Sequence, residues 1–317
     1  MKKLPDLDSI LKASKRIEKY IHRTPVLTSE NIDQLTNSRL FFKCENFQKA
    51  GAFKSRGALN AVFSLTVEEL NRGVCTHSSG NHAAALARAA GLRNTKAFIV
   101  MPNNSSKVKI NAVKHYGGEI TFCESNLQSR ESSLLKIKEK TNALEIHPYN
   151  DYRIIAGQAT AARELFEQAG FLDIIMAPVG GGGLMSGTAL VTHYMSPEIL
   201  IFGAEPKGAD DAFRSLVEGK LIPSVNPKTI ADGLLTSLGS LTFPIIQEYV
   251  DRIYTVTETG ILKAMKLVWE RMKMIIEPSS AVPLAAVLEY PEDFRNKRVG
   301  IIISGGNVDL DKIPWLT

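Results

Sequence analysis

Lys54 is the residue of this sequence whose surroundings fit an ordinary surface lysine least well. It stands in residues 51–61, GAFKSRGALNA, between Phe53 and small residues, with little polar cover and ahead of a predicted helix. A lone lysine usually packs its stem on apolar atoms and keeps its ammonium in water. In an apolar pocket, however, the ammonium loses stability, so the pKa falls and the neutral amine becomes a nucleophile. Both interpretations stay open on this segment alone.

Three glycine-containing loops follow predicted strands and have the composition of anion-binding sites. They are SSGNH (78–82), VGGGGLMSG (179–187) and SGGN (304–307). The first two precede predicted helices, whose unpaired N–H groups and dipoles stabilise a carboxylate or a phosphate. Four successive glycines also let the backbone wrap closely around a phosphate. Each loop alone is equally compatible with an ordinary turn, but together with Lys54 they indicate a phosphate-bearing ligand and a carboxylate-bearing partner.

Two common nucleotide-binding patterns are absent from the sequence. GxGxxG does not occur at the first strand–helix turn, and GxxxxGK[ST] occurs nowhere, which disfavours a Rossmann dehydrogenase and a P-loop enzyme. An amine that forms a Schiff base with an aldehyde, beside a loop that holds a phosphate, matches pyridoxal phosphate. In this interpretation Phe53 packs near the cofactor ring and the glycine loop holds its phosphate.

Strands and helices alternate along most of the chain. Predicted strands include residues 39–47, 73–77, 96–102, 144–149, 173–179, 199–206 and 298–304, and predicted helices include 8–21, 82–91, 105–117 and 281–289. This alternation predicts parallel sheets covered by helices on both faces, with ligands beyond the carboxyl ends of the strands. So many units would crowd one sheet, so we expect two α/β domains with a cleft between them. Residues 1–72 and 151–317 would form the large domain, and residues 73–150 the small one.

Composition excludes several classes of protein. The chain has 317 residues, of which 44% are hydrophobic, so it can bury a substantial core. Its net charge of +5 comes from residues spread along the chain, whereas nucleic-acid binding usually needs a clustered basic face. Cys44, Cys75 and Cys123 form no CxxC pair and indicate buried thiols. Because neither a signal peptide nor a run of ~18 apolar residues is present, we expect a soluble cytoplasmic protein.

The motifs taken together closely resemble those of fold-type II pyridoxal phosphate enzymes, and within them the serine racemase and serine/threonine dehydratase family. The resemblance runs from about Thr24 to the C-terminus. It rests on TPVLTS, FFKCENFQKAGAFKSRGALNAV, SSGNHAAAL, IAGQAT, PVGGGGLMSG, IADG, EPSSA and SGGNVDL. It implies two open α/β domains with mostly parallel sheets, like the tryptophan synthase beta subunit, with the cofactor in the cleft between them.

The resemblance also implies roles for individual residues. Lys54 would form the internal aldimine, Asn81 would hydrogen-bond the cofactor's phenolic oxygen, and Ser304 would face the pyridine nitrogen. The implied cofactor-binding residues are Phe53, Lys54, Asn81, Gly180, Gly181, Gly182, Gly183, Leu184 and Ser304. The implied substrate-binding residues are Ser78, Ser79, Asn81, His82 and Arg130. Because a hydroxyl can donate to an unprotonated nitrogen, the ring would be a weaker electron sink, which favours β-elimination or reprotonation over transamination.

The first expected activity is elimination of water from L-serine or L-threonine, with Lys54 removing the Cα proton, to give a 2-oxo acid and ammonia. Ser79 leaves serine racemisation open, because the racemases carry a serine there on the face opposite the lysine, and two-sided proton transfer needs a second acid. Arg130 resembles a racemase arginine near the distal end of the substrate and leaves 3-hydroxyaspartate open. Tyr149 replaces the asparagine usual in animal racemases and is more typical of dehydratases.

A second cluster, AEPKGADDAF (204–213), would on its own be taken as an acidic turn before a helix. The resemblance implies that Glu205, the Ala209 carbonyl and Asp211 bind a divalent cation, and all-oxygen ligation suits Mg²⁺ or Ca²⁺. It also implies a homodimer, whereas a nucleotide effector has no motif in its support. A non-catalytic sensor and a cysteine-synthase-like enzyme are the competing interpretations. Lys54 argues against the first, and the SSGNH loop argues against the second.

Overall fold

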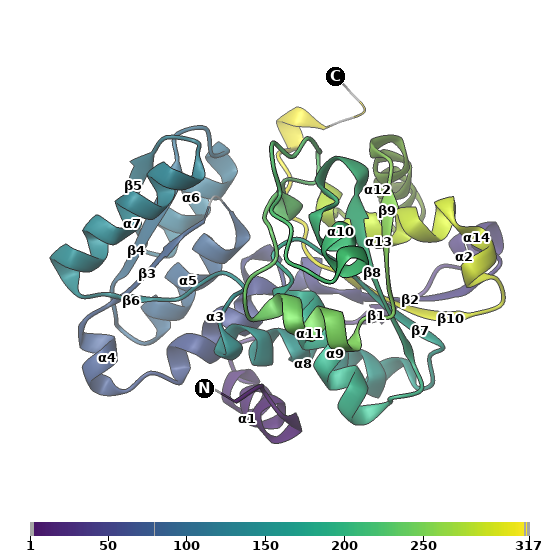
Figure 1. Ribbon diagram of the computed structural model, residues 1–317, viewed down its shortest axis with the longest axis horizontal. Coiled ribbons are helices and arrows are strands. Elements are labelled where there is room, and N and C mark those ends of the chain that lie inside the picture. The colour runs from purple at the N-terminus through teal and green to yellow at the C-terminus, as the bar shows by residue number, and fades with distance from the viewer. Residues whose placement is uncertain (1–2, 79, 314, 316–317) are drawn as a thin grey trace.

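Two sheets organise the chain in the computed structural model, which describes residues 3–78, 80–313 and 315 (Figure 1). The larger sheet has the spatial order β1 (Val26–Leu27), β2 (Arg39–Cys44), β10 (Arg298–Ile303), β7 (Ile174–Pro178), β8 (Leu200–Pro206) and β9 (Arg252–Val256). Its strands run parallel except for β1, which is antiparallel to β2. The predicted fold class, α/β with mostly parallel sheets, is confirmed.

The smaller sheet forms the left lobe of Figure 1. Its strands are all parallel, in the order β5 (Glu119–Cys123), β4 (Ala97–Pro102), β3 (Val74–His77) and β6 (Leu144–Glu145). All four strands lie within residues 73–150, and all strands of the larger sheet lie outside that range. The domain boundaries remain a prediction, and the division of the strands between the two sheets agrees with them.

Helices cover both faces of the larger sheet because its strands are apolar on both faces. Ile174 and Met176 of β7 pack in one core with the helices over 258–272 and 278–289, whereas Ile175 and Ala177 pack in the other with the helices over 152–169 and 183–195. The helices are α1 (Leu7–Ile17), α2 (Glu30–Thr36), α3 (Lys54–Phe63), α4 (Val67–Asn71), α5 (Asn81–Leu92), α6 (Lys107–His115), α7 (Leu127–Thr141), α8 (Tyr152–Ala169), α9 (Gly183–Met195), α10 (Asp211–Glu218), α11 (Thr242–Tyr249), α12 (Glu258–Met272), α13 (Pro278–Glu289) and α14 (Pro291–Phe294). Within the described chain, none of them is both long and apolar enough to cross a membrane.

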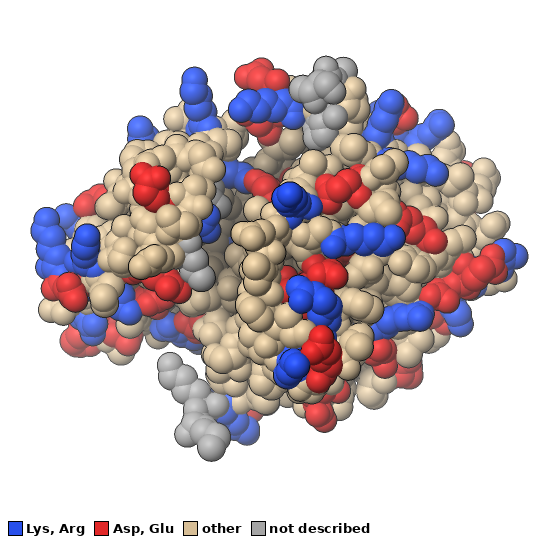
Figure 2. Space-filling model, turned by 45° about the horizontal axis from the view of Figure 1, so that its top comes forward, with Lys and Arg blue, Asp and Glu red and all other residues tan. Residues whose placement is uncertain are grey.

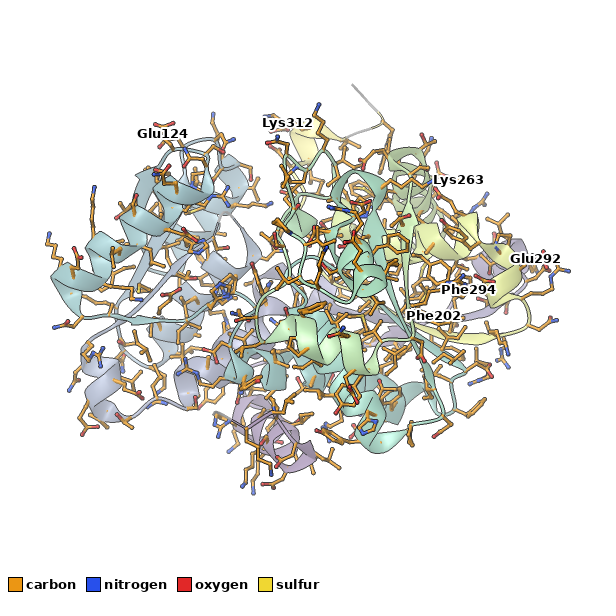
Figure 3. The ribbon with its side chains drawn as sticks, viewed as in Figure 1. Glu124, Phe202, Lys263, Glu292, Phe294 and Lys312 are labelled. Atoms are coloured by element: carbon orange, nitrogen blue, oxygen red, sulfur yellow. The ribbon has the colours of Figure 1, made fainter. Side chains whose placement is uncertain are left out.

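Aromatic packing fixes the outer part of the first core. The rings of Phe202 and Phe294 meet edge to face, with centroids 6.1 Å apart. Figure 3 shows these two side chains on the inside of the larger lobe, while Lys263 and Lys312 project from its outside. Burial of such aromatic pairs is a main source of stability in a core of this kind.

Three predicted elements end several residues earlier in the structure than the sequence indicates. The strand predicted over residues 39–47 ends at Cys44, and Glu45–Phe47 form a short 3₁₀ helix. The first helix stops at Ile17, after which a turn lays Tyr20 on Phe63, with ring centroids 4.5 Å apart. The strand predicted over residues 144–149 ends at Glu145, and Pro148, which has no N–H group, cannot donate to a ladder. The Pro148 carbonyl instead accepts a hydrogen bond from Lys54.

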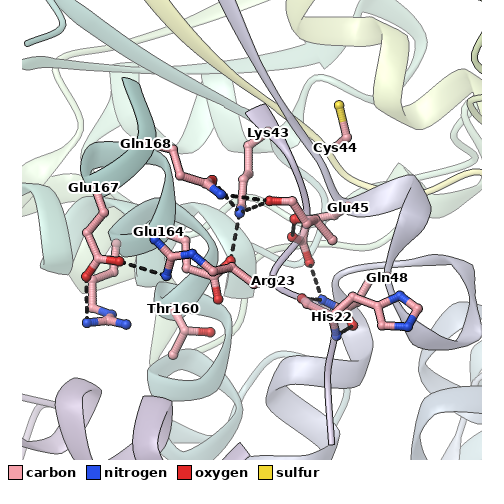
Figure 4. A network of polar contacts seen from close by, with 12 residues as sticks. His22, Arg23, Lys43, Cys44, Glu45, Gln48, Thr160, Glu164, Glu167 and Gln168 are labelled. Carbon is pink, nitrogen blue, oxygen red and sulfur yellow. Dashed lines mark hydrogen bonds and ion pairs between the residues drawn. The ribbon is translucent and has the colours of Figure 1, made fainter. Parts of the chain in front are cut away.

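A buried ion network holds the beginning of α3, and Figure 4 shows the part of it around Lys43 and Glu164. Arg56 donates to both carboxylate oxygens of Glu45 at 2.7 and 2.8 Å, and to both oxygens of Glu164 at 2.8 and 2.9 Å. Lys43 of β2 donates to the same Glu164 carboxylate at 2.7 Å. Two cations and two anions thus balance one another, as charges removed from water must. The network ties β2 and α8 to the helix that begins at Lys54.

Candidate active site

The amine of Lys54 is partly buried at the first residue of α3. Its Nζ donates to the Pro148 carbonyl at 2.8 Å and lies 5.1 Å from the centroid of the Phe53 ring. Removal from water lowers the pKa of Lys54 to about 8, and the opposing charge of Glu277 only partly offsets this. A substantial fraction of the amine is therefore neutral near pH 8 and able to act as a nucleophile or base.

Ser304, immediately after β10, lies beside Phe53, the residue before this lysine. Its carbonyl accepts the Phe53 N–H at 3.0 Å, and its hydroxyl oxygen is 2.9 Å from that of Ser280. Ser304 is almost fully buried. The end of β10 and the segment before α3 thus lie side by side, joined by the Phe53–Ser304 hydrogen bond and by a bridge between Ala52 and Gly305.

The glycine loop faces the segment that contacts Lys54. Gly182 has a φ of +82°, and α9 begins at the next residue without a side-chain cap on its N–H groups. A Cβ on Gly181 would overlap the Tyr149 ring, and one on Gly183 would lie 2.8 Å from the Tyr149 Cβ. Only glycine fits so close a packing, which leaves the amides of the first turn, including that of the buried Leu184, available to an anion.

The start of α5 comes from the smaller lobe and contacts the larger one, and Figure 2 shows a hollow between the two lobes. Asn81 donates to the Glu277 carboxylate at 2.9 and 3.1 Å and accepts from Asn307 at 2.9 Å. Gly80 precedes the helix and, like Gly182, provides no side-chain cap. Ser78 accepts the Gly80 N–H at 3.4 Å. Ser79 lies outside the described residues, so its predicted position is neither supported nor contradicted.

His82 is buried and neutral. Burial, and secondarily the charge of Lys54, lower its pKa to about 3. Its Nε2 lies 3.1 Å from the Ile146 carbonyl, which can only accept, so Nε2 carries the proton. Nδ1 has no hydrogen-bond partner within the described part of the chain. The imidazole thus anchors α5 to the smaller sheet and is not a base at neutral pH.

Arg130 lies apart from the residues above, on α7. No hydrogen bond joins it to another predicted site residue within the described ranges, and its Nε is buried without a partner there. Its charge contributes, after burial, to the lowered pKa of His77 at the end of β3. The His77 and His147 rings have centroids 6.1 Å apart, and the His147 and Tyr149 rings 4.6 Å. These rings connect the end of β3, where the charge of Arg130 acts, to Tyr149, which follows the Pro148 that contacts Lys54.

The comparisons with known proteins agree with this geometry. The family model described as "Pyridoxal-phosphate dependent enzyme" matches residues 17–305. The chain belongs to the pyridoxal-phosphate dependent enzymes. It is 54% identical over 311 residues to the serine racemase of Dictyostelium discoideum (97% of this chain, 96% of that one) and 50% identical over 312 residues to the beta-hydroxyaspartate dehydratase of Paracoccus denitrificans (98% and 99%). The structure of maize serine racemase superposes with a TM-score of 0.96 at 47% identity, covering 99% of this chain and 97% of that one.

The residues present fit the cofactor of this family. The chain supplies an amine with a lowered pKa, a glycine turn with uncapped amides where an added Cβ would clash, and a buried hydroxyl. These match the aldehyde, the phosphate and the pyridine nitrogen of pyridoxal phosphate in number and kind. The predicted recognition of a fold-type II enzyme of the racemase and dehydratase group is confirmed.

The acidic cluster forms a separate group between β8 and α10. Glu205 is fully buried and accepts the N–H groups of Ala212 and Phe213 at 3.2 and 2.8 Å. Burial raises the pKa of Asp211 to about 6, and burial together with Asp211 raises that of Glu205 well above its ordinary value. Both Asp211 oxygens are buried without a partner in the described chain. No three His, Cys, Asp or Glu side chains converge among the described residues, so a cation here would need a carbonyl such as that of Ala209.

Sequence reasoning missed two groups at the cleft. Glu277, from the EPSSA motif, contacts Asn81, and burial followed by the charge of Asp232 raises its pKa to about 7. Lys109 of α6 pairs with Asp232 and so joins the two lobes. The EPSSA and IADG motifs gave a signal for Glu277 and Asp232, but nothing in the sequence distinguishes Lys109 from other surface lysines.

Proposed function

We propose that the protein is a pyridoxal-phosphate-dependent L-serine/L-threonine ammonia-lyase, a dehydratase that yields a 2-oxo acid and ammonia. The observation that carries the proposal is the amine of Lys54, whose pKa of about 8 suits proton removal near neutral pH. The solved structure of a threonine deaminase supports the reaction class, since it superposes with a TM-score of 0.92 at 42% identity, covering 96% of this chain and 99% of that one.

Each predicted residue would hold one part of the cofactor. Lys54 would bind the aldehyde carbon, Asn81 the phenolic oxygen and Ser304 the pyridine nitrogen, while Phe53 would flank the ring. The amides of residues 180–184 would bind the phosphate, favoured by the dipole of α9. When bound, pyridoxal phosphate supplies a conjugated ring that withdraws electrons from the substrate's Cα.

The protein's own groups would then handle the substrate. The N–H groups at the start of α5, with Ser78 and Asn81, would bind the substrate carboxylate. The neutral amine of Lys54 would take the Cα proton, and the β-hydroxyl would leave with a proton as water. The unsaturated amino acid that is released is then hydrolysed, which consumes one water and frees ammonia. The net products are a 2-oxo acid and ammonia. His82 has no proton-transfer role in this scheme because it stays neutral and is tied to Ile146.

Serine racemisation is the second candidate. It is favoured by Ser79 in the sequence and by the serine racemases to which the chain is 54% and 50% identical, from Dictyostelium discoideum and Arabidopsis thaliana. Ser79 would return a proton to Cα from the face opposite Lys54. Ser79→Ala should then abolish D-serine and spare the 2-oxo acid.

3-Hydroxyaspartate is a further candidate substrate. The buried Nε of Arg130 has no partner within the described chain, and a guanidinium with an unused donor suits a second carboxylate. The relative named beta-hydroxyaspartate dehydratase, 50% identical to this chain, supports this alternative. Arg130→Gln should raise KM for 3-hydroxyaspartate much more than KM for L-serine if the carboxylate binds there.

One set of parallel reactions tests these alternatives. Purified protein with Mg²⁺ is given L-serine, L-threonine or 3-hydroxyaspartate, and both the 2-oxo acid and the D-amino acid are measured. The proposal expects mostly 2-oxo acid from L-serine and L-threonine. D-serine at a comparable rate would favour the racemase, and turnover of 3-hydroxyaspartate alone would make the acidic substrate the physiological class.

We also propose that Glu205, the Ala209 carbonyl and Asp211 bind Mg²⁺ or Ca²⁺. The burial of both carboxylates supports this, because a cation would neutralise charge that is costly to bury. The homodimer and the nucleotide effector stay predictions, to be tested by light scattering and by assays with added nucleotide.

A further inference from the structure

Ser280, in the first turn of α13, is a fully buried hydroxyl that the scheme above does not use. Its Oγ donates to the Gly305 carbonyl at 2.7 Å, accepts the Gly305 N–H at 2.7 Å and lies 2.9 Å from the Ser304 Oγ, where either hydroxyl can be the donor. Ser280 therefore contacts the side chain of Ser304 and both backbone groups of the next residue.

The hydrogen bonds of this cluster can be counted. A hydroxyl has one hydrogen to donate and two lone pairs with which to accept. The Gly305 N–H donates to Ser280, so one lone pair is occupied. The Gly305 carbonyl also accepts the Glu277 N–H at 3.0 Å, so it keeps a donor even when Ser280 turns its hydrogen elsewhere. The Ser280 hydrogen can consequently turn from the Gly305 carbonyl to Ser304 without leaving that carbonyl unpaired.

Only one hydrogen fits between the two hydroxyl oxygens. When Ser280 donates to Ser304, the hydrogen of Ser304 must point away from Ser280. We propose that Ser280 is a positioning residue that donates to Ser304 and so commits the Ser304 hydroxyl to donate to the pyridine nitrogen of the cofactor. The inference rests on the proposed place of Ser304 opposite that nitrogen, but not on which amino acid is the substrate.

This arrangement has a consequence for the protonation of the ring. A hydroxyl that itself accepts a hydrogen bond is a stronger donor, because bonds in a chain polarise one another. Donation from Ser304 holds the ring nitrogen in its unprotonated form, which uses its lone pair to accept. Without Ser280, the Ser304 hydroxyl is free to rotate and accept from a protonated nitrogen instead. Ser280→Ala should therefore let the ring nitrogen protonate at higher pH.

Ser279 provides a matched control in the same turn of α13. It is equally buried, and its hydroxyl accepts the N–H of another glycine, Gly233, at 3.0 Å. Ser279→Ala thus removes the same kind of bond as Ser280→Ala without touching Ser304. Ser304→Ala, which removes the donor itself, sets the upper limit of the effect.

The experiment follows the ¹⁵N chemical shift of ¹⁵N-labelled pyridoxal phosphate bound to each protein across pH. We expect the protonation midpoint of Ser280→Ala to exceed that of the wild type by about one pH unit, a tenfold change in protonation. Ser304→Ala should move the midpoint at least as far, and Ser279→Ala should match the wild type. If Ser280→Ala does not retain cofactor, Ser280→Cys, whose thiol is a weak donor, should show a smaller shift in the same direction.

An unchanged midpoint in Ser280→Ala, or in Ser280→Cys where that variant is needed, would overturn the inference alone. A shift in Ser279→Ala as large as that in Ser280→Ala would also overturn it, because loss of packing would then explain both. An unchanged midpoint in Ser304→Ala would overturn both the inference and the proposed place of Ser304. Failure of the wild type to take up the labelled cofactor would overturn the proposed function with it.

Discussion

Replacing Glu164 should destabilise the protein far more than replacing Glu167, although both glutamates lie on α8 and each bridges two cations. Glu164 pairs with Lys43 and Arg56, whose side chains are 0% exposed, and is itself 7% exposed. Glu167 pairs with Arg23 and Arg163 at 2.9 and 2.8 Å, but is 34% exposed. The two sites thus have similar distances and differ in burial.

The expected magnitudes follow from that difference. Removing one partner of a buried ion pair typically costs about 3–5 kcal/mol, because the remaining charge is left in a medium of low dielectric constant. In Glu164→Ala, Arg56 keeps Glu45, but Lys43 keeps only the uncharged Thr24 carbonyl and Gln168. We therefore expect a loss of about 3 kcal/mol or more for Glu164→Ala. An exposed pair contributes about 0–1 kcal/mol, which is the loss expected for Glu167→Ala.

Urea unfolding of the two variants and the wild type, followed by circular dichroism, measures these losses. A double variant, Lys43→Met with Glu164→Ala, removes the stranded ammonium and should recover part of the stability. Equal losses in Glu164→Ala and Glu167→Ala would refute the reasoning. So would a double variant less stable than Glu164→Ala alone, because the cost would then lie in packing and not in an uncompensated charge.

Four further outcomes are expected. Lys54→Ala should fold with an unchanged far-ultraviolet spectrum but lack both turnover and the yellow absorbance of a covalently held cofactor; a yellow, active variant would contradict the role of Lys54. The pKa of Lys54 in the folded protein is about 8, so the rate at which the cofactor-free chain captures pyridoxal phosphate should rise about tenfold per pH unit below 8 and level off above it. Absorbance follows this rate, and a rate that does not change with pH would contradict the expectation. Mg²⁺ added after EDTA treatment should raise the melting temperature, by the equivalent of about 2.7 kcal/mol at a hundredfold excess over Kd, and Asp211→Asn should remove the response. Gly181→Ala should weaken pyridoxal phosphate binding at least tenfold because its Cβ would overlap the Tyr149 ring, whereas Gly91→Ala, which meets only an ordinary contact at 3.6 Å, should bind it normally.

The sequence was most informative where local pattern decides structure. Alternating strands and helices predicted the α/β class, and the predicted strand over residues 298–304 differs from β10 by one residue. The glycine loop and the unusual place of Lys54 were also visible, because both depend on neighbours along the chain. Two-residue strands such as β1, which is antiparallel to β2, are too short to produce a pattern.

What the sequence could not give is the set of partners that folding brings together. The Pro148 carbonyl that accepts from Lys54 lies 94 residues away along the chain, and Glu277 lies 196 residues from Asn81. Lys109 and Asp232 are 123 residues apart and meet only because two sheets pack on either side of a cleft. Ser280 was one of two adjacent serines in EPSSA, and only the packing of α13 against the end of β10 distinguishes it from Ser279.

The most direct test of the central claim is a stoichiometric assay of L-serine and L-threonine with purified protein, pyridoxal phosphate and Mg²⁺. We predict that 2-oxo acid and ammonia appear in equal amounts, in greater quantity than any D-amino acid, and that Lys54→Ala forms neither. A yellow wild-type protein that released D-serine without 2-oxo acid, or that turned over neither substrate, would contradict the account.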